Sequence, residues 1–185
     1  FTFNFKEFMP PTIVTKNLRE IENFLDNFND IITKPLYGNG GEGIHRFNKN
    51  NFNPNILKQY LDLPIMVQKY IKEIDQGDRR LIIIDGEYCG SVARIPKDGD
   101  IKANFHAGGI PSKTDLVFRD KEIIDVVGPK LRDNNLFFVG IDIIGDYLTE
   151  VNVTSPTGIK QINTLNNVNL EKVFWDKLEA KYKLV

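Results

Sequence analysis

Apolar residues recur along the chain at two spacings, and each spacing predicts a different element. After Asn17, apolar residues follow every three or four positions, which is typical of an amphipathic helix. Glu20 stands three residues after Asn17, the spacing of a capping box, so we expect the helix to begin there. Further helices are predicted over residues 54–61, 114–133 and 170–183.

Short apolar runs between turn residues predict strands. The clearest runs are residues 31–35, 44–47, 65–70, 80–84 and 87–94. Asp85-Gly86 is a strong signal for a hairpin between the last two runs. Because the strands come in hairpins, and no alternating strand–helix–strand series is visible, the pattern predicts the α+β class. We expect antiparallel β-sheets with helices packed to one side.

Residues 138–157 predict a further hairpin, with oxygen-bearing side chains in an apolar frame. Glu150 and Asn152 are two positions apart, so on a strand they point to one face, and Asp142 lies on the other strand. Carboxylate and amide oxygens suit a hard cation such as Mg²⁺, which commonly holds substrate phosphates. The alternative is an ordinary polar face over solvent, but polar groups in so apolar a frame need partners.

The loop of this hairpin decides whether its acidic residues meet. A two-residue turn at 145–146 would set Asp142 opposite Thr149, and Asp142 and Glu150 would then point to opposite faces. A three-residue loop over 144–146 would place Asp142 diagonal to Glu150, within reach of its side chain. We therefore predict the three-residue loop.

The bulk composition narrows the class of protein. With 185 residues, 41% of them hydrophobic, the chain can form one compact domain with a packed core. A net charge of −1, with no basic run longer than a pair, argues against nucleic acid and membrane surfaces as partners. The single Cys89 excludes an internal disulfide and fits a reducing, cytoplasmic setting. No bilayer-length apolar stretch or signal peptide is visible, and the missing initial Met indicates a piece of a longer protein.

A glycine-rich segment follows the first predicted strand. Lys34 at the strand end supplies a positive charge for phosphate, and glycines within 38–43 let backbone N–H groups turn toward an anion. The segment is not a Walker A motif, because no G-K-[ST] follows the glycines and no helix begins there. A flexible turn is the alternative interpretation.

The next predicted strand and hairpin suggest a nucleotide. The backbone of residues 69–71 could read an adenine edge, and Asp78 could bind ribose hydroxyls, unless it only pairs with a neighbouring arginine. Arg80 and Arg94 could bind substrate carboxylates, or be ordinary surface arginines. On a regular hairpin these two arginines face opposite sides. A shared face needs a bulge, for which Gly90 is the natural place.

Residues 96–111 predict a long loop, and long loops within compact domains are commonly functional lids. His106 lies in this loop and could titrate near neutrality, but a solvated histidine is the ordinary interpretation. We assign it no catalytic role.

Taken in order, these segments resemble the ATP-grasp domain of bacterial glutathione synthetases. The resemblance runs from about Pro11 to the last predicted helix. The matching stretches are Ile32-Thr-Lys-Pro-Leu-Tyr-Gly-Asn-Gly-Gly, Asp78-Arg-Arg-Leu-Ile-Ile-Ile-Asp-Gly-Glu, Ala93-Arg-Ile-Pro, residues 104–109 and, most specifically, Val139-Gly-Ile-Asp-Ile-Ile-Gly-Asp-Tyr-Leu-Thr-Glu-Val-Asn-Val-Thr-Ser-Pro-Thr.

The resemblance implies an ATP-grasp fold that holds the nucleotide between two α+β subdomains. These would be a small or lid subdomain over 15–74 and a large one over 75–185, after a linker at 1–14 from a missing N-terminal domain. The residues implied to bind ATP are Lys34, Gly38, Gly40, Gly41, Gln68, Lys69, Tyr70, Ile71, Asp78 and Asn152. Those implied to bind Mg²⁺, or Mn²⁺, are Asp142, Glu150 and Asn152. Those implied to bind the peptide substrate are Arg80, Arg94, Ser155, Pro156 and Thr157, and the implied catalytic set is Arg80, Arg94 and Asn104.

The reaction that the resemblance implies joins γ-glutamylcysteine and glycine into glutathione, using ATP and an acyl phosphate, in a homotetramer. Lys102 stands where some relatives carry Arg. Two alternatives remain. One is a related ATP-grasp carboxylate–amine ligase for another peptide, against which the Ser155-Pro156-Thr157 run argues. The other is a truncated fragment that binds nucleotide without turnover, which the missing upstream domain favours.

Overall fold

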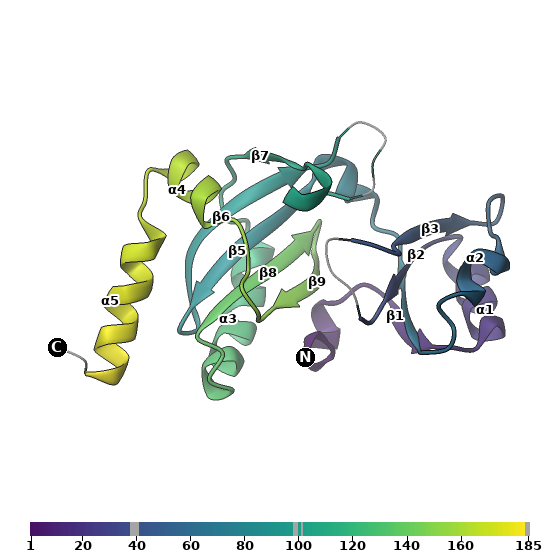
Figure 1. Ribbon diagram of the computed structural model, residues 1–185, viewed down its shortest axis with the longest axis horizontal. Coiled ribbons are helices and arrows are strands. Elements are labelled where there is room, and N and C mark those ends of the chain that lie inside the picture. Colours follow the sequence, from purple (N-terminus) through teal and green to yellow (C-terminus); the bar gives the residue numbers. More distant parts are fainter. Residues whose placement is uncertain (38–40, 98–99, 101, 184–185) are drawn as a thin grey trace.

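The computed structural model describes residues 1–37, 41–97, 100 and 102–183. They form two antiparallel β-sheets that lie in two subdomains side by side (Figure 1). The expected α+β class with antiparallel sheets is confirmed.

The smaller subdomain has a four-stranded sheet with two helices. Its strands, in spatial order, are β1 (Thr12–Thr15), β4 (Ile65–Lys69), β2 (Asp30–Pro35) and β3 (His45–Asn48). Helices α1 (Leu18–Phe28) and α2 (Pro54–Lys58) bury Ile21 and Leu57 against one face of this sheet. The opposite face carries Ile32 and Lys34, two positions apart on β2, and is left open toward the larger subdomain.

The larger subdomain has a five-stranded sheet. Its strands, in spatial order, are β7 (Ile110–Ser112), β6 (Glu87–Ile95), β5 (Asp78–Ile84), β8 (Phe138–Ile144) and β9 (Tyr147–Asn152). The β5–β6 turn lies at Asp85-Gly86, as expected. Both residues have positive φ, 51° and 78°, which suits a tight hairpin turn.

Helices cover both faces of this larger sheet, so the expectation of helices on one side is wrong here. Side chains alternate along β5. Leu81 and Ile83 pack under α3 (Phe118–Asp133), whereas Ile82 and Ile84 pack under α4 (Ile159–Asn166) and α5 (Leu170–Tyr182). A strand with apolar side chains on both faces needs helices on both sides of the sheet to bury them.

The N-terminal residues belong to both subdomains. The 3₁₀ helix η1 (Thr2–Phe8) buries Phe5 and Phe8 in the core beneath α3, and β1 then pairs with β4. Residues 1–14, expected to be a linker, therefore contribute to both cores. Two further 3₁₀ helices are η2 (Lys72–Gln76), between β4 and β5, and η3 (Phe105–Ala107), within the long loop.

The predicted helix start at Asn17 is confirmed. Asn17 is the N-cap of α1, and its side chain accepts a hydrogen bond from the Arg19 N–H at 3.0 Å. The pattern did not predict β1 or α4. Thr12–Thr15 is too short for a clear period, and α4 buries little more than Ile162.

Candidate functional site

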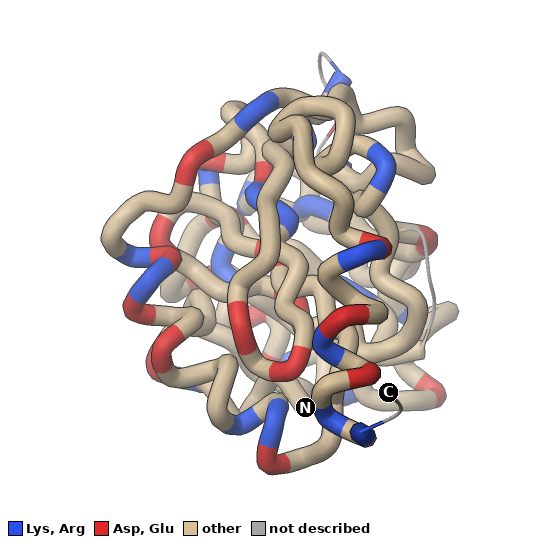
Figure 2. Tube along the Cα trace, turned by 90° about the vertical axis from the view of Figure 1, so that its left-hand side faces the viewer, with Lys and Arg blue, Asp and Glu red and all other residues tan. Residues whose placement is uncertain are grey.

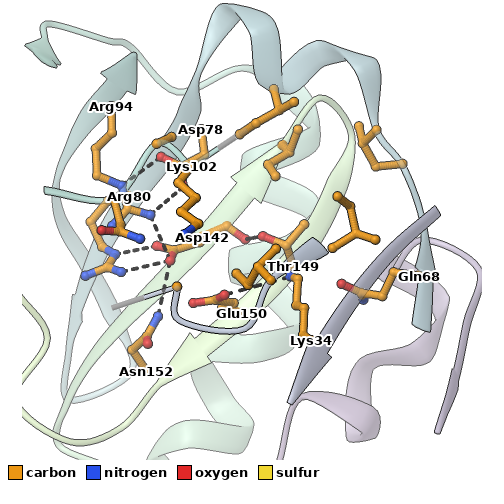
Figure 3. Close-up of a pocket in the computed structure, with 18 of the residues that line it drawn as sticks. Lys34, Gln68, Asp78, Arg80, Arg94, Lys102, Asp142, Thr149, Glu150 and Asn152 are labelled. Atoms are coloured by element: carbon orange, nitrogen blue, oxygen red, sulfur yellow. Dashed lines mark hydrogen bonds and ion pairs between the residues drawn. The ribbon is translucent and has the colours of Figure 1, made fainter. Parts of the chain in front are cut away.

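A cavity of about 560 Å³ lies between the two subdomains, within the size range of small-molecule sites. Figure 3 shows how side chains from both sheets point into it. The smaller subdomain contributes Ile32, Lys34, Gln68 and Tyr70, the long loop contributes Lys102, Ala103, Asn104 and His106, and the larger subdomain contributes Asp78, Arg80, Arg94, Asp142, Glu150 and Asn152.

A β-bulge brings the two arginines to one face. The register of β5 against β6 shifts between Ile82 and Ile83, where Cys89 is the extra residue next to Gly90. Beyond the bulge, Arg94 stands opposite Asp78, and so lies on the same face as Arg80 two positions further along β5. The predicted bulge is thus confirmed.

Asp142 on β8 is held by both arginines, which form with Asp78 and Asp142 an arginine–aspartate cluster (Figure 3). Arg80 binds both carboxylate oxygens, Nη2 donating to Oδ2 at 2.8 Å, and Arg94 Nη2 lies 2.9 Å from the same Oδ2. Arg94 Nε also donates to Asp78 Oδ1 at 2.7 Å. Asn152 Nδ2 donates to Asp142 Oδ2 at 3.3 Å.

The charges of this cluster shift the pKa values of its carboxyls in opposite directions. Burial raises the pKa of Asp142, but Arg94 and Arg80 outweigh it and lower the pKa to about 2. Burial raises the pKa of Asp78 to about 6, against the hydrogen bond from Arg94. Asp78 does pair with a neighbouring arginine, as the simpler alternative held, so its contact with ribose stays a prediction.

In the β8–β9 hairpin, Asp142 and Glu150 share a face, as predicted, but the turn between the strands is not the predicted one. Its turn has two residues, 145–146, so the predicted three-residue loop is wrong. Thr149 is an extra residue in β9, and this bulge sets Asp142 directly opposite Glu150. The Thr149 hydroxyl donates to the Asp142 carbonyl at 3.1 Å, which holds the bulge in place. The two carboxylates therefore share a face because of a bulge within the strand.

The oxygens of this face fit Mg²⁺ bound together with phosphates. Asn152 turns its amide nitrogen to Asp142, which leaves its Oδ1 directed elsewhere, and Glu150 is half exposed. Within the described ranges, no group of three or more His, Cys, Asp and Glu side chains is placed to bind a metal. Two carboxylates and an amide suit Mg²⁺, which commonly takes one or two carboxylates and completes its shell with phosphate oxygens and water.

Lys34 connects the two sheets at this point. Its Nζ lies 3.8 Å from Glu150 Oε1, across the cavity from its own strand β2. Gly41, which also lines the cavity, has a φ of +82°, and a Cβ there would lie 3.1 Å from Asn104 Nδ2. Gly41 therefore lies against Asn104 of the long loop at the cavity. Gly38 and Gly40 lie outside the described residues.

An apolar slot lies at the other end of the cavity. Buried Tyr70, Ile74 and Ala103 form it together with half-buried Ile32 and Ile144, which come from both sheets and the long loop. These residues are scattered in the sequence, so periodicity alone could not have identified the slot.

Tyr70 is fixed from several sides. The Arg46 guanidinium lies over its ring, 3.6 Å from the centroid, and Arg46 in turn binds Asp30. The Tyr70 hydroxyl bonds Asp75 Oδ1 at 3.2 Å. Gln68, predicted to contact ATP, also lines the cavity, and its amide nitrogen donates to a β1 hydroxyl. These contacts hold the side chains of Tyr70 and Gln68 in place beside the cavity.

The remaining predicted residues, Asn104 and Ser155 to Thr157, also line the cavity. The Thr157 carbonyl accepts from Arg80 Nη1 at 3.0 Å, and Ser155 and Pro156 line the cavity beside it. Asn104 Oδ1 accepts from the Ala107 N–H at 2.8 Å and so begins η3. All predicted site residues within the described ranges line one cavity. The sequence reasoning missed Thr149 and the slot.

Comparison with known proteins points to one family. Residues 1–167 match the family model described as prokaryotic glutathione synthetase, ATP-grasp domain. The glutathione synthetase of Mesorhizobium japonicum is 43% identical over 187 residues, covering 99% of this chain and 60% of that protein. That of Synechococcus elongatus is 44% identical over 184 residues, covering 97% and 57%. The chain thus spans about 60% of the length of the curated relatives it matches.

Solved structures agree on the fold. The ATP-grasp ligase PsnB, complexed with a precursor peptide and AMPPNP, matches with a TM-score of 0.70 and 16% identity, over 95% of this chain and 54% of that one. D-alanine–D-alanine ligase from Bacillus anthracis matches with a TM-score of 0.65 and 16% identity, over 99% and 66%. The expected ATP-grasp fold is confirmed. In the described part of the chain no helix is long and apolar enough to cross a membrane.

Proposed function

The chain belongs to the prokaryotic glutathione synthetase ATP-grasp family, and we propose that it is the nucleotide-binding part of a ligase joining γ-glutamylcysteine to glycine. The observation that carries this proposal is the cavity itself. It places Lys34, two carboxylates of a hairpin and an apolar slot around one space between two sheets. The slot suits a base, Lys34 suits the phosphates, and the two carboxylates suit a divalent cation.

The nucleotide would lie along the cavity. The apolar slot takes the base, and the backbone of residues 69–71 lies at its edge. Lys34 and the N–H groups near Gly41 meet the phosphates. Asp142, Glu150 and Asn152 would hold Mg²⁺, or Mn²⁺, which neutralises charge on the transferring phosphoryl group. A further PsnB structure with Mg and ADP supports this class of ligand for the fold.

The proposed reaction has two steps, and residues of this chain bind the peptide substrate and exclude water during them. A substrate carboxylate oxygen attacks the terminal phosphorus, ADP leaves, and an acyl phosphate results. The glycine amine then attacks the acyl carbon, phosphate leaves, and the amine loses a proton. Arg80, fixed between Asp142 and the Thr157 carbonyl, presents positive charge where the peptide carboxylate would bind. Asn104 begins η3 in the long loop that covers the cavity and would exclude water from the acyl phosphate.

The proposal includes the wider setting of the enzyme. The two subdomains divide near residue 74, an upstream domain completes the peptide site, and the enzyme is a cytoplasmic homotetramer. A net charge of −1 supports small-molecule substrates over nucleic acid, and Lys and Arg are interspersed with Asp and Glu along the chain in Figure 2.

The test measures ADP release from the full-length protein with MgATP and γ-glutamylcysteine, with and without glycine. We expect release that depends on both acceptor and glycine. Replacement of γ-glutamylcysteine by other peptides separates this ligase from a related one. Nucleotide binding without ADP release under any combination would favour a protein that binds nucleotide without turnover.

Glu150→Gln provides the decisive variant, because it removes one carboxylate and keeps the shape. We expect turnover to fall by about a hundredfold or more, with the thermal unfolding temperature unchanged, since Glu150 is half exposed. Glu179→Gln on the exposed face of α5 is the matched control and should keep full activity. An unchanged rate for Glu150→Gln would remove Glu150 from the metal site.

A further inference from the structure

The ladder between β1 and β4 stops at a proline. Residues of the two strands pair in register from Thr15 with Ile65 to Thr12 with Gln68, so the next pair is Pro11 with Lys69. The Lys69 N–H donates to the Pro11 carbonyl at 2.9 Å. In an antiparallel ladder such a pair exchanges two hydrogen bonds. The second would run from the N–H of residue 11 to the Lys69 carbonyl, and proline has no N–H.

The strand on the other side of β4 does not use this carbonyl either. The Tyr70 N–H donates to the Asp30 carbonyl at 3.0 Å, so Tyr70 directs its backbone groups toward β2. Since these groups alternate in direction along a strand, those of Lys69 point toward β1. Within the described residues, the Lys69 carbonyl therefore has no partner in either neighbouring strand.

This carbonyl lies where the cavity begins. Pro10, Lys69, Tyr70 and Ile71 all line it. The Pro10 carbonyl is occupied by the Thr12 hydroxyl at 2.7 Å. The backbone stays extended at Ile71, with φ −106° and ψ 107°, so its N–H points to the same side as the groups of Lys69. An acceptor and a donor two residues apart thus border the apolar slot.

We propose that Pro11 is a specificity-determining residue of the nucleotide site. By ending the β1–β4 ladder, it keeps the Lys69 carbonyl available to the 6-amino group of adenine, while the Ile71 N–H serves the adjacent ring nitrogen. The inference rests on the proposed nucleotide site. The simpler alternative is that a proline is tolerated here because it precedes an edge strand. Under that alternative, Pro11 does not affect which base is bound.

The test compares two nucleotides by calorimetry on the protein and its variants. One is MgADP, and the other is the diphosphate of purine riboside, which lacks the 6-amino group. Pro11→Ala and Pro11→Ser both supply an N–H that competes for the Lys69 carbonyl. We expect the wild-type preference for ADP to fall by roughly threefold to tenfold in both variants, with binding of the purine riboside analogue unchanged. Thermal unfolding checks that both variants fold.

Pro54→Ala is the matched control, because Pro54 is the first residue of α2, where an N–H has no helical partner in any case. It should leave the preference for ADP intact. If the Pro11 variants weaken both nucleotides equally, Pro11 has only a structural role and the inference fails. If the wild-type protein binds both nucleotides equally well, the inference also fails while the nucleotide site stands. Absence of any nucleotide binding by the wild type would overturn the proposed function as well.

Discussion

Among single residues, Asp142 shows how one side chain serves both stability and the site. Its carboxylate is fully buried and touches two guanidinium groups, and it is also a candidate ligand of the cation. Arg80 and Arg94 keep it ionised at any pH at which an enzyme works. The arginines thereby keep this candidate ligand charged in a buried position, where an isolated carboxylate would take up a proton.

Asp142→Asn should lower the free energy of unfolding by about 3–5 kcal/mol near neutral pH, because buried Arg80 loses its carboxylate partner and buried Arg94 keeps only Asp78. The folded-state pKa of Asp142, about 2, lies below its unfolded value. Its contribution is therefore present above about pH 4 and is lost as the pH falls toward 2. The difference between wild type and variant, measured by urea unfolding in EDTA, should shrink over that window.

The charge of Asp142 contributes to the raised pKa of Asp78, so the variant also changes the titration of Asp78. Asp125→Asn, on the exposed surface of α3, is the control and should change stability by no more than about 0.5 kcal/mol at any pH. A stability gap for Asp142→Asn that stays constant from pH 7 to pH 2 would contradict the assigned charge state.

Among the elements, two hairpins of the larger sheet bring their candidate site residues to one face by means of bulges. Each bulge adds one residue to a strand, at Cys89 or at Thr149, and so turns the following residues to the other face. Without the first bulge, Arg80 and Arg94 would face opposite sides. Without the second, Glu150 would point into the core beneath α3. Both hairpins keep ordinary two-residue turns, which position the strands against α3.

Helix α3 contacts the β5–β6 turn through Gly128, so a substitution that helix propensity favours should still destabilise the protein here. A Cβ on Gly128 would lie 2.3 Å from the Gly86 carbonyl oxygen. Gly128→Ala gains about 1 kcal/mol of propensity, yet α3 must move off the turn. We expect the free energy of unfolding to fall by about 1–3 kcal/mol in urea titrations.

Asp125→Ala, at an exposed position of the same helix, isolates the propensity term and should be neutral or stabilising. A stabilised Gly128→Ala protein would mean that the helix and the turn do not pack backbone to backbone.

At the scale of the whole molecule, two cores are joined around a cleft that neither forms alone. Residues on one face of the smaller sheet and charged residues on one face of the larger sheet line the cavity. The N-terminal residues help to fix this arrangement, since η1 packs beneath the larger sheet while β1 belongs to the smaller one. The segment expected to be a linker therefore packs with the larger sheet and pairs with the smaller one.

Phe5→Ala should reveal this role. Phe5 is fully buried among residues of α3 and the larger sheet. Its truncation should cost about 3–5 kcal/mol of unfolding free energy, as for a ring removed from a core. Phe1→Ala is the control, because Phe1 is 44% exposed, and it should cost less than about 1 kcal/mol. Equal small effects for both variants would show that residues 1–9 are a linker after all.

The sequence by itself determined most of the helices and strands and most of the polar residues of the candidate site. Helical spacing after Asn17, the Asp85-Gly86 turn and the polar residues of 138–157 are local signals, and each one follows from the period or turn chemistry of a few neighbouring residues. The same local residues carried the family resemblance. These features are decided over short distances along the chain, so they can be read without knowing the fold.

Only the tertiary structure decided which face of a strand each site side chain lies on and which residues it pairs with. Thr149 gives no local sign of a bulge, because an extra residue is tolerated only where packing on both faces fixes the strands beside it. The choice of Asp142 and Asp78 as partners for the arginines depends on which strands become neighbours. The apolar slot depends on it too, since its walls come from both sheets and the long loop. Contacts between distant segments exist only once the chain has folded.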